Sequence, residues 1–155
     1  MDEKMVLDQL VRMSTEIGRP ENDYVILGEG NTSARIDDEH FFVKASGKYL
    51  SRAGADIFVK VRFKDALAMI DGPDLTDDQI KAALSAACAE PGNSLRPSIE
   101  TTFHAMLLSL PGVNFIAHTH ATVVNMLMCS SKAEEIIKGR VFPDEIIFCG
   151  IEPIF

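Results

Sequence analysis

The chain has 155 residues, of which 46% are hydrophobic and 25% charged, and it carries a formal charge of −8. These proportions are typical of one globular domain and exclude a disordered or low-complexity chain. The acidity excludes the broad positive surface with which proteins bind nucleic acids or anionic membranes. We therefore expect neither partner, although a local group of backbone amides can still hold a small anion.

The N-terminus and the cysteines predict a cytoplasmic protein. Asp2 and Glu3 stand where a secretory signal has basic residues, and no apolar stretch approaches the roughly 18 residues of a membrane helix. Cys88, Cys129 and Cys149 are unevenly spaced and lie in apolar surroundings. This pattern favours buried free thiols in a reducing compartment over disulfides or a cysteine-based metal site.

Hydrophobic periodicity and turn residues predict helices and strands that alternate along the chain. In chain order we expect a helix at 2–18, a small-residue turn and a short run at 27–36, strands at 40–47 and 56–61, helices at 62–70, 76–90 and 97–110, a strand at 113–120, a helix at 121–129 and an apolar run at 146–149. Thr76 and Gln79 form a capping-box pattern. The alternation favours a layered α/β domain, and no repeat or linker divides residues 1–155.

His118 and His120 are the sharpest local signal for chemistry. Two residues apart on a predicted strand, their imidazoles lie on one face, where both can bind the same metal ion. Such a pair also occurs by chance at a surface or in a core, so an acidic neighbour is needed to favour metal binding. Glu100 is a candidate, although a glutamate in the first turn of a helix is also stabilised by the helix dipole alone. His104, one turn later, is either a supporting residue or a satisfied, half-buried histidine.

Three small-residue turns could converge on a phosphate. Ser98 stands at the expected cap of the helix that carries Glu100, and the turns at 28–33 and 45–47 offer further amides and hydroxyls. Each of them taken singly is a plain turn, and the first lacks both the spacing of a dinucleotide fingerprint and the lysine of a P-loop. Lys44 is either a charge near such an anion or a solvated side chain.

Taken together and in this order, four segments resemble the class II aldolase/adducin family. They are residues 28–35, 44–48, 96–100 and 113–120, so the resemblance spans most of the chain. It implies a three-layer α/β/α sandwich with a largely antiparallel central sheet, as a single domain over residues 1–155. It also implies a homotetramer, a zinc or other divalent metal cofactor, and a phosphorylated sugar as the small-molecule substrate.

Carried over residue by residue, the resemblance implies that His118 and His120 are metal ligands and that Glu100 is the catalytic acid/base, able to approach the metal. The positions that it implies for binding phosphate or substrate are Gly30, Asn31, Ser46, Gly47, Ser98 and Ile99. The family's third histidine ligand normally lies further downstream, and no histidine follows His120. Cys149 and Glu152 carry atoms that bind zinc, but we expect neither to replace that ligand and expect the domain to be C-terminally short.

The resemblance implies a metal-dependent aldolase, a lyase that cleaves a sugar phosphate or a related hydroxy-carbonyl compound by a retro-aldol reaction through a zinc-stabilised enediolate. Such a reaction needs a Lewis acid at the substrate oxygens, a base that moves a proton, and a hold on the phosphate. Two alternatives stay open. One is a sugar-phosphate epimerase or dehydratase of the same family, and the other is a non-catalytic adducin-like domain or an inactive fragment.

Overall fold

The computed structural model describes residues 2–70, 72–90 and 92–137. The chain divides into two compact units, with the boundary between His120 and Ala121. The first unit contains the sheet and all the site residues predicted from the sequence, and it is described first.

Within the described residues, the first unit consists of four helices, four strands and three short 3₁₀ turns. The helices are α1 (Glu3–Ile17), α2 (Phe63–Ala68), α3 (Asp77–Ala86) and α4 (Thr101–Leu108). The strands are β1 (Asn31–Arg35), β2 (His40–Lys44), β3 (Phe58–Arg62) and β4 (Phe115–His118). The 3₁₀ turns are η1 (Pro20–Asn22), η2 (Leu50–Arg52) and η3 (Ala55–Ile57).

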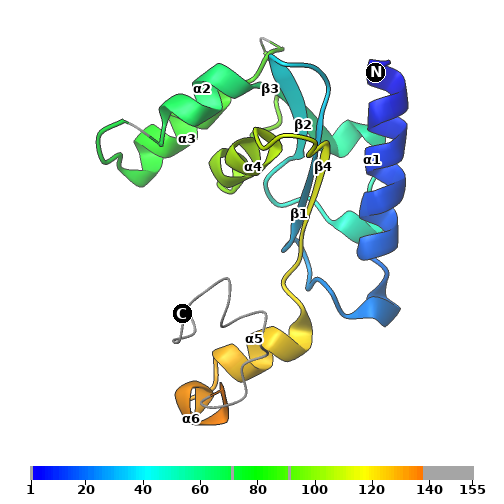
Figure 1. Ribbon diagram of the computed structural model, residues 1–155, viewed down its shortest axis with the longest axis vertical. Helices are drawn as coiled ribbons and strands as arrows, with labels where there is room; N and C mark the ends of the chain where they lie inside the picture. Colours follow the sequence, from blue (N-terminus) through cyan, green and yellow to red (C-terminus); the bar gives the residue numbers. More distant parts are fainter. Residues whose placement is uncertain (1, 71, 91, 138–155) are drawn as a thin grey trace. The chain divides into compact units, whose positions relative to one another are not determined.

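The four strands form one antiparallel sheet in the order β3-β2-β1-β4. Helix α1 lies on one face of this sheet, and α2, α3 and α4 lie on the other (Figure 1). The fold is therefore a layered α/β/α arrangement around an antiparallel sheet, which confirms the predicted fold class. Although β4 is the last strand among the described residues, it pairs with β1 and brings His118 opposite Asn31.

Alternation along the strands divides the apolar core between the two faces of the sheet. Phe41 and Val43 of β2 point toward the layer of α2 and α4, where Leu108 packs against them. Phe42 points the opposite way and packs with Leu10 of α1. Because burying one large apolar side chain contributes about 1.5–3 kcal/mol, both helical layers are fixed to the sheet by apolar burial.

Strand β1 carries polar side chains into the core and links the two layers through them. Thr32 Oγ1 lies 2.7 Å from Ser14 Oγ of α1, and Ser33 Oγ lies 2.7 Å from His104 Nδ1 of α4. All four side chains are fully buried. A buried polar group without a partner costs about 1–3 kcal/mol, so these bonds allow polar residues in the middle of the sheet.

Helix α3 is shorter than the helix predicted at 76–90. Its capping box is present: Thr76 accepts from the amide of Gln79, whose side chain accepts from the amide of Thr76 in return. The helix ends early because the residues after it pair with β3, where the amide of Arg62 donates to the carbonyl of Ala87.

Helix α4 begins later than the helix predicted at 97–110, because Pro97 forms a β-bridge with Ala45 and holds this part of the chain extended. The apolar residues that follow a helical spacing along this segment face outward. The exposed members are Ile99, Phe103, Met106 and Leu110. His104 and Leu108 lie on the buried face instead, where the first bonds to β1 and the second joins the apolar core.

The second unit is described as far as residue 137. It contains α5 (Thr122–Met128), which confirms the helix predicted at 121–129, and α6 (Ala133–Ile137). The predicted apolar run at 146–149 lies outside the described residues, as do Cys149 and Glu152.

The two described cysteines are free thiols. Cys88 is half-buried, and burial raises the pKa of its thiol, so it stays protonated and unreactive at neutral pH. Cys129 ends α5 and is exposed, so the expectation of a buried thiol is wrong at this position.

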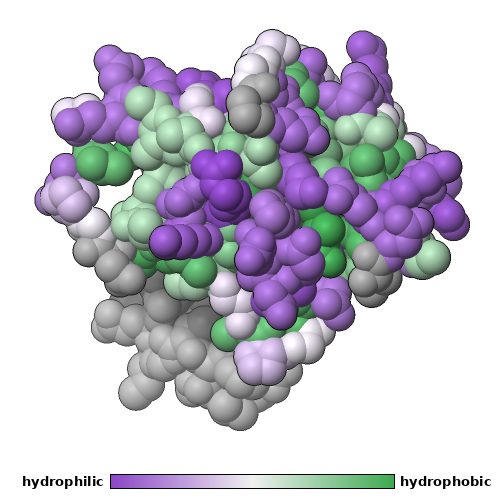
Figure 2. All heavy atoms as spheres, turned by 90° about the horizontal axis from the view of Figure 1, so that it is seen from above, coloured by the Kyte–Doolittle hydropathy of each residue, from purple (hydrophilic) through white to green (hydrophobic). Residues whose placement is uncertain are grey.

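The surface is mixed in polarity. Figure 2 shows hydrophilic residues over much of one face, with hydrophobic residues in smaller groups between them. Among the described helices, none has the length and apolar character needed to cross a membrane.

Candidate functional site

Two segments of the first unit bring the predicted metal residues together. Strand β4 ends at His118, so His120 lies beyond it, and the expectation that both histidines share one face of a strand is wrong. The turn after the strand nevertheless places the two rings with their centroids 4.8 Å apart. Glu100 stands immediately before α4, which packs against β4, and it faces both histidines.

One oxygen of Glu100 approaches both imidazoles. Glu100 Oε1 is 3.5 Å from His118 Nδ1 and 3.5 Å from His120 Nε2. One ligand atom from each of the three residues lies within 4.8 Å of the other two. Tetrahedral zinc, with bonds of about 2.0–2.1 Å to nitrogen, separates its ligand atoms by roughly 3.3 Å. These donors therefore fit one small divalent ion with little movement.

The burial of these donors supports the same fit. The side chains of His118, His120 and Glu100 are 30%, 32% and 25% exposed. His118 Nδ1 is buried and has no hydrogen-bond partner among the described residues. Because an unpartnered buried polar atom is costly, a metal ion bound at this nitrogen would remove a penalty that the protein otherwise bears.

Ser98 orients Glu100 and does not cap α4. Glu100 is itself the N-cap residue, so the expected cap at Ser98 is wrong. Ser98 Oγ accepts from the amide of Glu100 at 3.3 Å and lies 3.5 Å from Glu100 Oε2. The two carboxylate oxygens therefore have different neighbours, Ser98 for Oε2 and the histidines for Oε1. Ile99, between these residues, is 69% exposed.

The positions implied for phosphate binding differ in how open they are to a ligand. Gly30 (φ 73°) leads into Asn31, whose buried side-chain amide has no hydrogen-bond partner among the described residues. Gly47 has the same φ of 73°, and apart from its chain neighbours no atom of the described residues lies within 4 Å of the place where a side chain would begin. Ser46 donates its amide to the carbonyl of Arg96 at 2.9 Å. Gly47 thus remains open to a ligand, Asn31 keeps a buried amide without a partner among the described residues, and Ser46 offers its hydroxyl, which accepts from the Arg96 guanidinium at 3.5 Å.

Lys44 fastens two of these turns together, a role that the sequence did not indicate. Its side chain is almost fully buried, and Nζ donates to the carbonyl of Gly28 at 2.9 Å and to that of Lys48 at 2.7 Å. Burial lowers the pKa of the Lys44 ammonium, and the negative charge of Glu100 opposes that shift. Lys44 is therefore not solvated, and its bonds hold the turn at Gly28 against the turn at Gly47.

His104 is a fully buried histidine next to the metal residues. Its Nδ1 bonds to Ser33 Oγ at 2.7 Å, and its ring centroid lies 6.0 Å from that of His118. Burial lowers its pKa to about 4, although the charge of Glu100 opposes the shift. The ring is therefore neutral at pH 7 and adds no positive charge beside a cation site.

Glu29 is a neighbour of the site that the sequence analysis missed. Its Oε2 lies 3.5 Å from His120 Nδ1, on the other side of the ring from Glu100. In the sequence it is one glutamate between two glycines, with nothing to distinguish it from an exposed loop residue. Only the pairing of β1 with β4 brings its turn next to His120.

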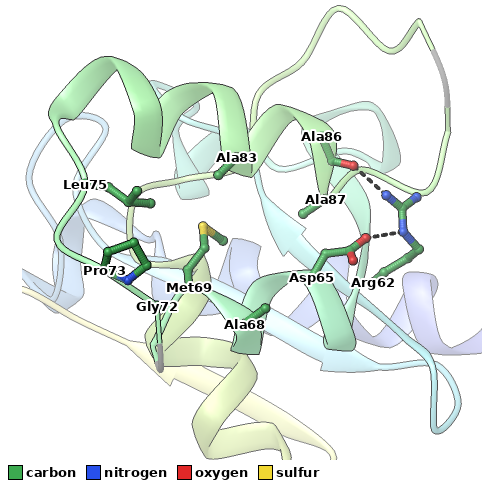
Figure 3. Close-up of a pocket in the computed structure, with 10 residues that line it drawn as sticks. All are labelled: Arg62, Asp65, Ala68, Met69, Gly72, Pro73, Leu75, Ala83, Ala86 and Ala87. Carbon is green, nitrogen blue, oxygen red and sulfur yellow. Dashed lines mark hydrogen bonds and ion pairs between the residues drawn. The ribbon is translucent and has the colours of Figure 1, made fainter.

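A separate hollow of about 480 Å³ lies between α2 and α3 (Figure 3). Arg62 on its wall forms an ion pair with Asp65 and donates to the carbonyls of Ala86 and Cys88. Through these hydrogen bonds the guanidinium holds the C-terminal end of α3. None of the predicted site residues lines this hollow, so it is distinct from the metal cluster.

The fold and the cluster agree with a comparison against protein families. The family described as "Class II Aldolase and Adducin N-terminal domain" matches residues 8–150. The chain therefore belongs to the class II aldolase/adducin family.

Solved structures of the same superfamily have a similar fold. The N-terminal class II aldolase domain of a conserved protein from Thermoplasma acidophilum aligns with a TM-score of 0.69 and 28% identity, over 89% of this chain and 65% of that one. YgbL from Klebsiella pneumoniae, described at the level of aldolase/epimerase/decarboxylase, aligns with a TM-score of 0.54 and 20% identity, over 84% and 51%. An aldolase II superfamily protein from Pseudomonas syringae aligns with a TM-score of 0.54 and 16% identity, over 88% and 49%.

These comparisons define the family and the fold. The chain spans 65% of the solved Thermoplasma chain and about half of the other two solved chains. A comparison with curated proteins gave no match.

Proposed function

We propose that this chain carries the active site of a metal-dependent aldolase, which cleaves a carbon–carbon bond in a phosphorylated sugar or a related hydroxy-carbonyl compound. The observation that carries the proposal is the convergence of Glu100 Oε1, His118 Nδ1 and His120 Nε2. Zinc or another divalent ion held there would supply a Lewis acid for the substrate oxygens. A neutral imidazole nitrogen and a carboxylate oxygen are both donors that zinc accepts.

Glu100 is the residue that moves the proton in this proposal. Its carboxylate takes the proton from the substrate hydroxyl, that hydroxyl carbon becomes the carbonyl of the leaving product, and the carbon–carbon bond breaks. The electron pair of the broken bond passes to the remaining fragment, and Glu100 returns the proton to its carbon. Ser98 holds the other carboxylate oxygen, so the proton-carrying group keeps one orientation through both transfers.

The phosphate of the substrate would be held by the turns around the cluster. Asn31 has a buried side-chain amide without a partner among the described residues, Gly47 lies in an open turn, and Ser46 has a hydroxyl. Binding energy from a phosphate remote from the reacting carbons orients the substrate and so lowers the barrier of the chemical step. The overall negative charge of the chain does not oppose this, because amides and hydroxyls act over short range.

The test is retro-aldol cleavage of a panel of ketose phosphates, followed by trapping of the carbonyl product, with metal present in saturating amount. We expect Glu100→Gln to lower the turnover of the active substrate by about 10²–10⁴-fold, the usual contribution of a general base. Glu39→Gln, which removes an exposed carboxylate from the β1–β2 hairpin, is the matched control and should keep full activity. Absence of cleavage by the metal-loaded wild type, or equal turnover in both variants, would contradict the proposal.

A further inference from the structure

We infer that Glu29 is a positioning residue for His120: its carboxylate holds the proton on Nδ1, so that Nε2 is presented unprotonated to the metal. This inference rests on the proposed function. It concerns a residue of the loop before β1 that lies in the turn at 28–33 but is neither a predicted metal ligand nor a predicted phosphate-binding position.

The two nitrogens of His120 face two different carboxylates. Nε2 lies 3.5 Å from Glu100 Oε1, within the metal cluster, while Nδ1 lies 3.5 Å from Glu29 Oε2, outside it. A neutral imidazole carries its proton on one nitrogen and a lone pair on the other. A carboxylate beside Nδ1 favours the tautomer with the proton there, which leaves the lone pair on the nitrogen that faces Glu100 and the cluster.

The loop that carries Glu29 is held on both sides of that residue. Lys44 Nζ donates to the carbonyl of Gly28 at 2.9 Å, and the amide of Glu29 donates to the carbonyl of Ile26 at 2.9 Å. A side chain built on Gly30 would lie 2.4 Å from Val25 Cγ1, so the chain packs tightly immediately after Glu29. The carboxylate is thus delivered to His120 by a fixed backbone.

The two histidines differ in the groups that orient their rings. For His118 the structure places Glu100 beside Nδ1 and the ring of Phe103 at 5.7 Å, edge to face. Apolar packing therefore orients His118, while a charged neighbour orients His120. The Glu29 side chain is 51% exposed, so it can be replaced without leaving a cavity in the core.

The experiment measures metal affinity and does not depend on activity. Zn²⁺ is titrated against a chromophoric chelator in the presence of the metal-free full chain, and Co²⁺ absorption reports the ligand set. We expect Glu29→Ala to weaken Zn²⁺ binding by about 10–100-fold with an unchanged Co²⁺ spectrum, the usual effect of losing a carboxylate that orients a ligand. Glu29→Gln keeps an acceptor oxygen and should lose less.

Glu21→Gln is the matched control, since it removes the same charge from an exposed position in η1. It should leave the affinity unchanged. An affinity for Glu29→Ala within twofold of wild type, an equal loss in Glu21→Gln, or a Co²⁺ spectrum that shows one ligand fewer would each overturn the inference. Failure of the wild type to bind Zn²⁺ would instead overturn the proposed function on which it rests.

Discussion

His104 illustrates how a single buried residue affects the neighbouring site. It lies in the protein interior with one nitrogen bonded to Ser33, and its ring is a neighbour of His118. A charged imidazolium there would repel a divalent ion and would be poorly solvated. The lowered pKa keeps the ring neutral, which suits a neighbouring cation site and links folding to pH.

The pH dependence of stability tests this residue. The unfolded chain takes up the His104 proton at the ordinary histidine pKa of 6.5, whereas the native protein takes it up only near pH 4. Acid therefore favours the unfolded state. The contribution of His104 to the free energy of unfolding is fully present above about pH 6.5, and this free energy decreases by roughly 3 kcal/mol as the pH falls to 4. We expect the free energy of unfolding, measured with urea on metal-free protein, to decrease less steeply with acid for His104→Asn than for wild type. Parallel curves for the two proteins would contradict the assignment.

The residues of the metal cluster could be predicted from the sequence by their residue types and their order. The neighbouring residues that support the cluster could not. His118, His120 and Glu100 stand out in the sequence because few side chains bind metals or transfer protons. Lys44 and Glu29 do not stand out, because the role of each depends on a backbone or ring brought close by strand pairing. Long-range pairing is the information that local patterns lack.

At the scale of elements, the same limit explains which boundaries were predicted. Helix α1 and the capping box of α3 are local features, and both agree with the sequence expectation. The ends of α3, α4 and β4 differ from it because tertiary contacts decide them, such as the bridge between Pro97 and Ala45. Which face of α4 points outward could not be predicted from the sequence either, because apolar residues occur on most sides of that helix.

The bonds from Lys44 lead to a prediction about the loop between η1 and β1. Lys44→Met roughly keeps the length of the side chain but removes its hydrogen bonds to the carbonyls of Gly28 and Lys48. The turn at Gly28 is then no longer held against the turn at Gly47. Each hydrogen bond to a charged group contributes about 1.5–3 kcal/mol, so amides at 26–31 should exchange with deuterium roughly tenfold faster or more. The matched control is Lys64→Met in α2, an exposed lysine. Unchanged exchange in Lys44→Met would show that these bonds do not hold the loop.

At the scale of the whole molecule, the cluster joins segments that are far apart in the sequence. Glu100 precedes α4, His118 ends β4, and His120 lies in the turn after that strand. The turn at Gly28 lies next to the histidines because β1, which follows it, pairs with β4. The unfolded chain has no such arrangement of donors. A metal ion that binds here therefore binds the native state preferentially, and the net charge of −8 does not disfavour a cation.

Thermal unfolding of residues 1–155 with added metal measures this linkage. Zn²⁺ at a hundred times its dissociation constant should stabilise the protein by about 2.7 kcal/mol, which for a chain of this size raises Tm by roughly 5–10 °C. We expect His120→Asn to lose most of this increase, because the cluster then lacks one imidazole nitrogen. His40→Asn is the matched control: His40 lies in the β1–β2 hairpin beside Asp37, apart from the cluster, and its loss should leave the increase intact. If both variants kept the full increase, or both lost it, zinc would be stabilising the protein at some place other than Glu100, His118 and His120.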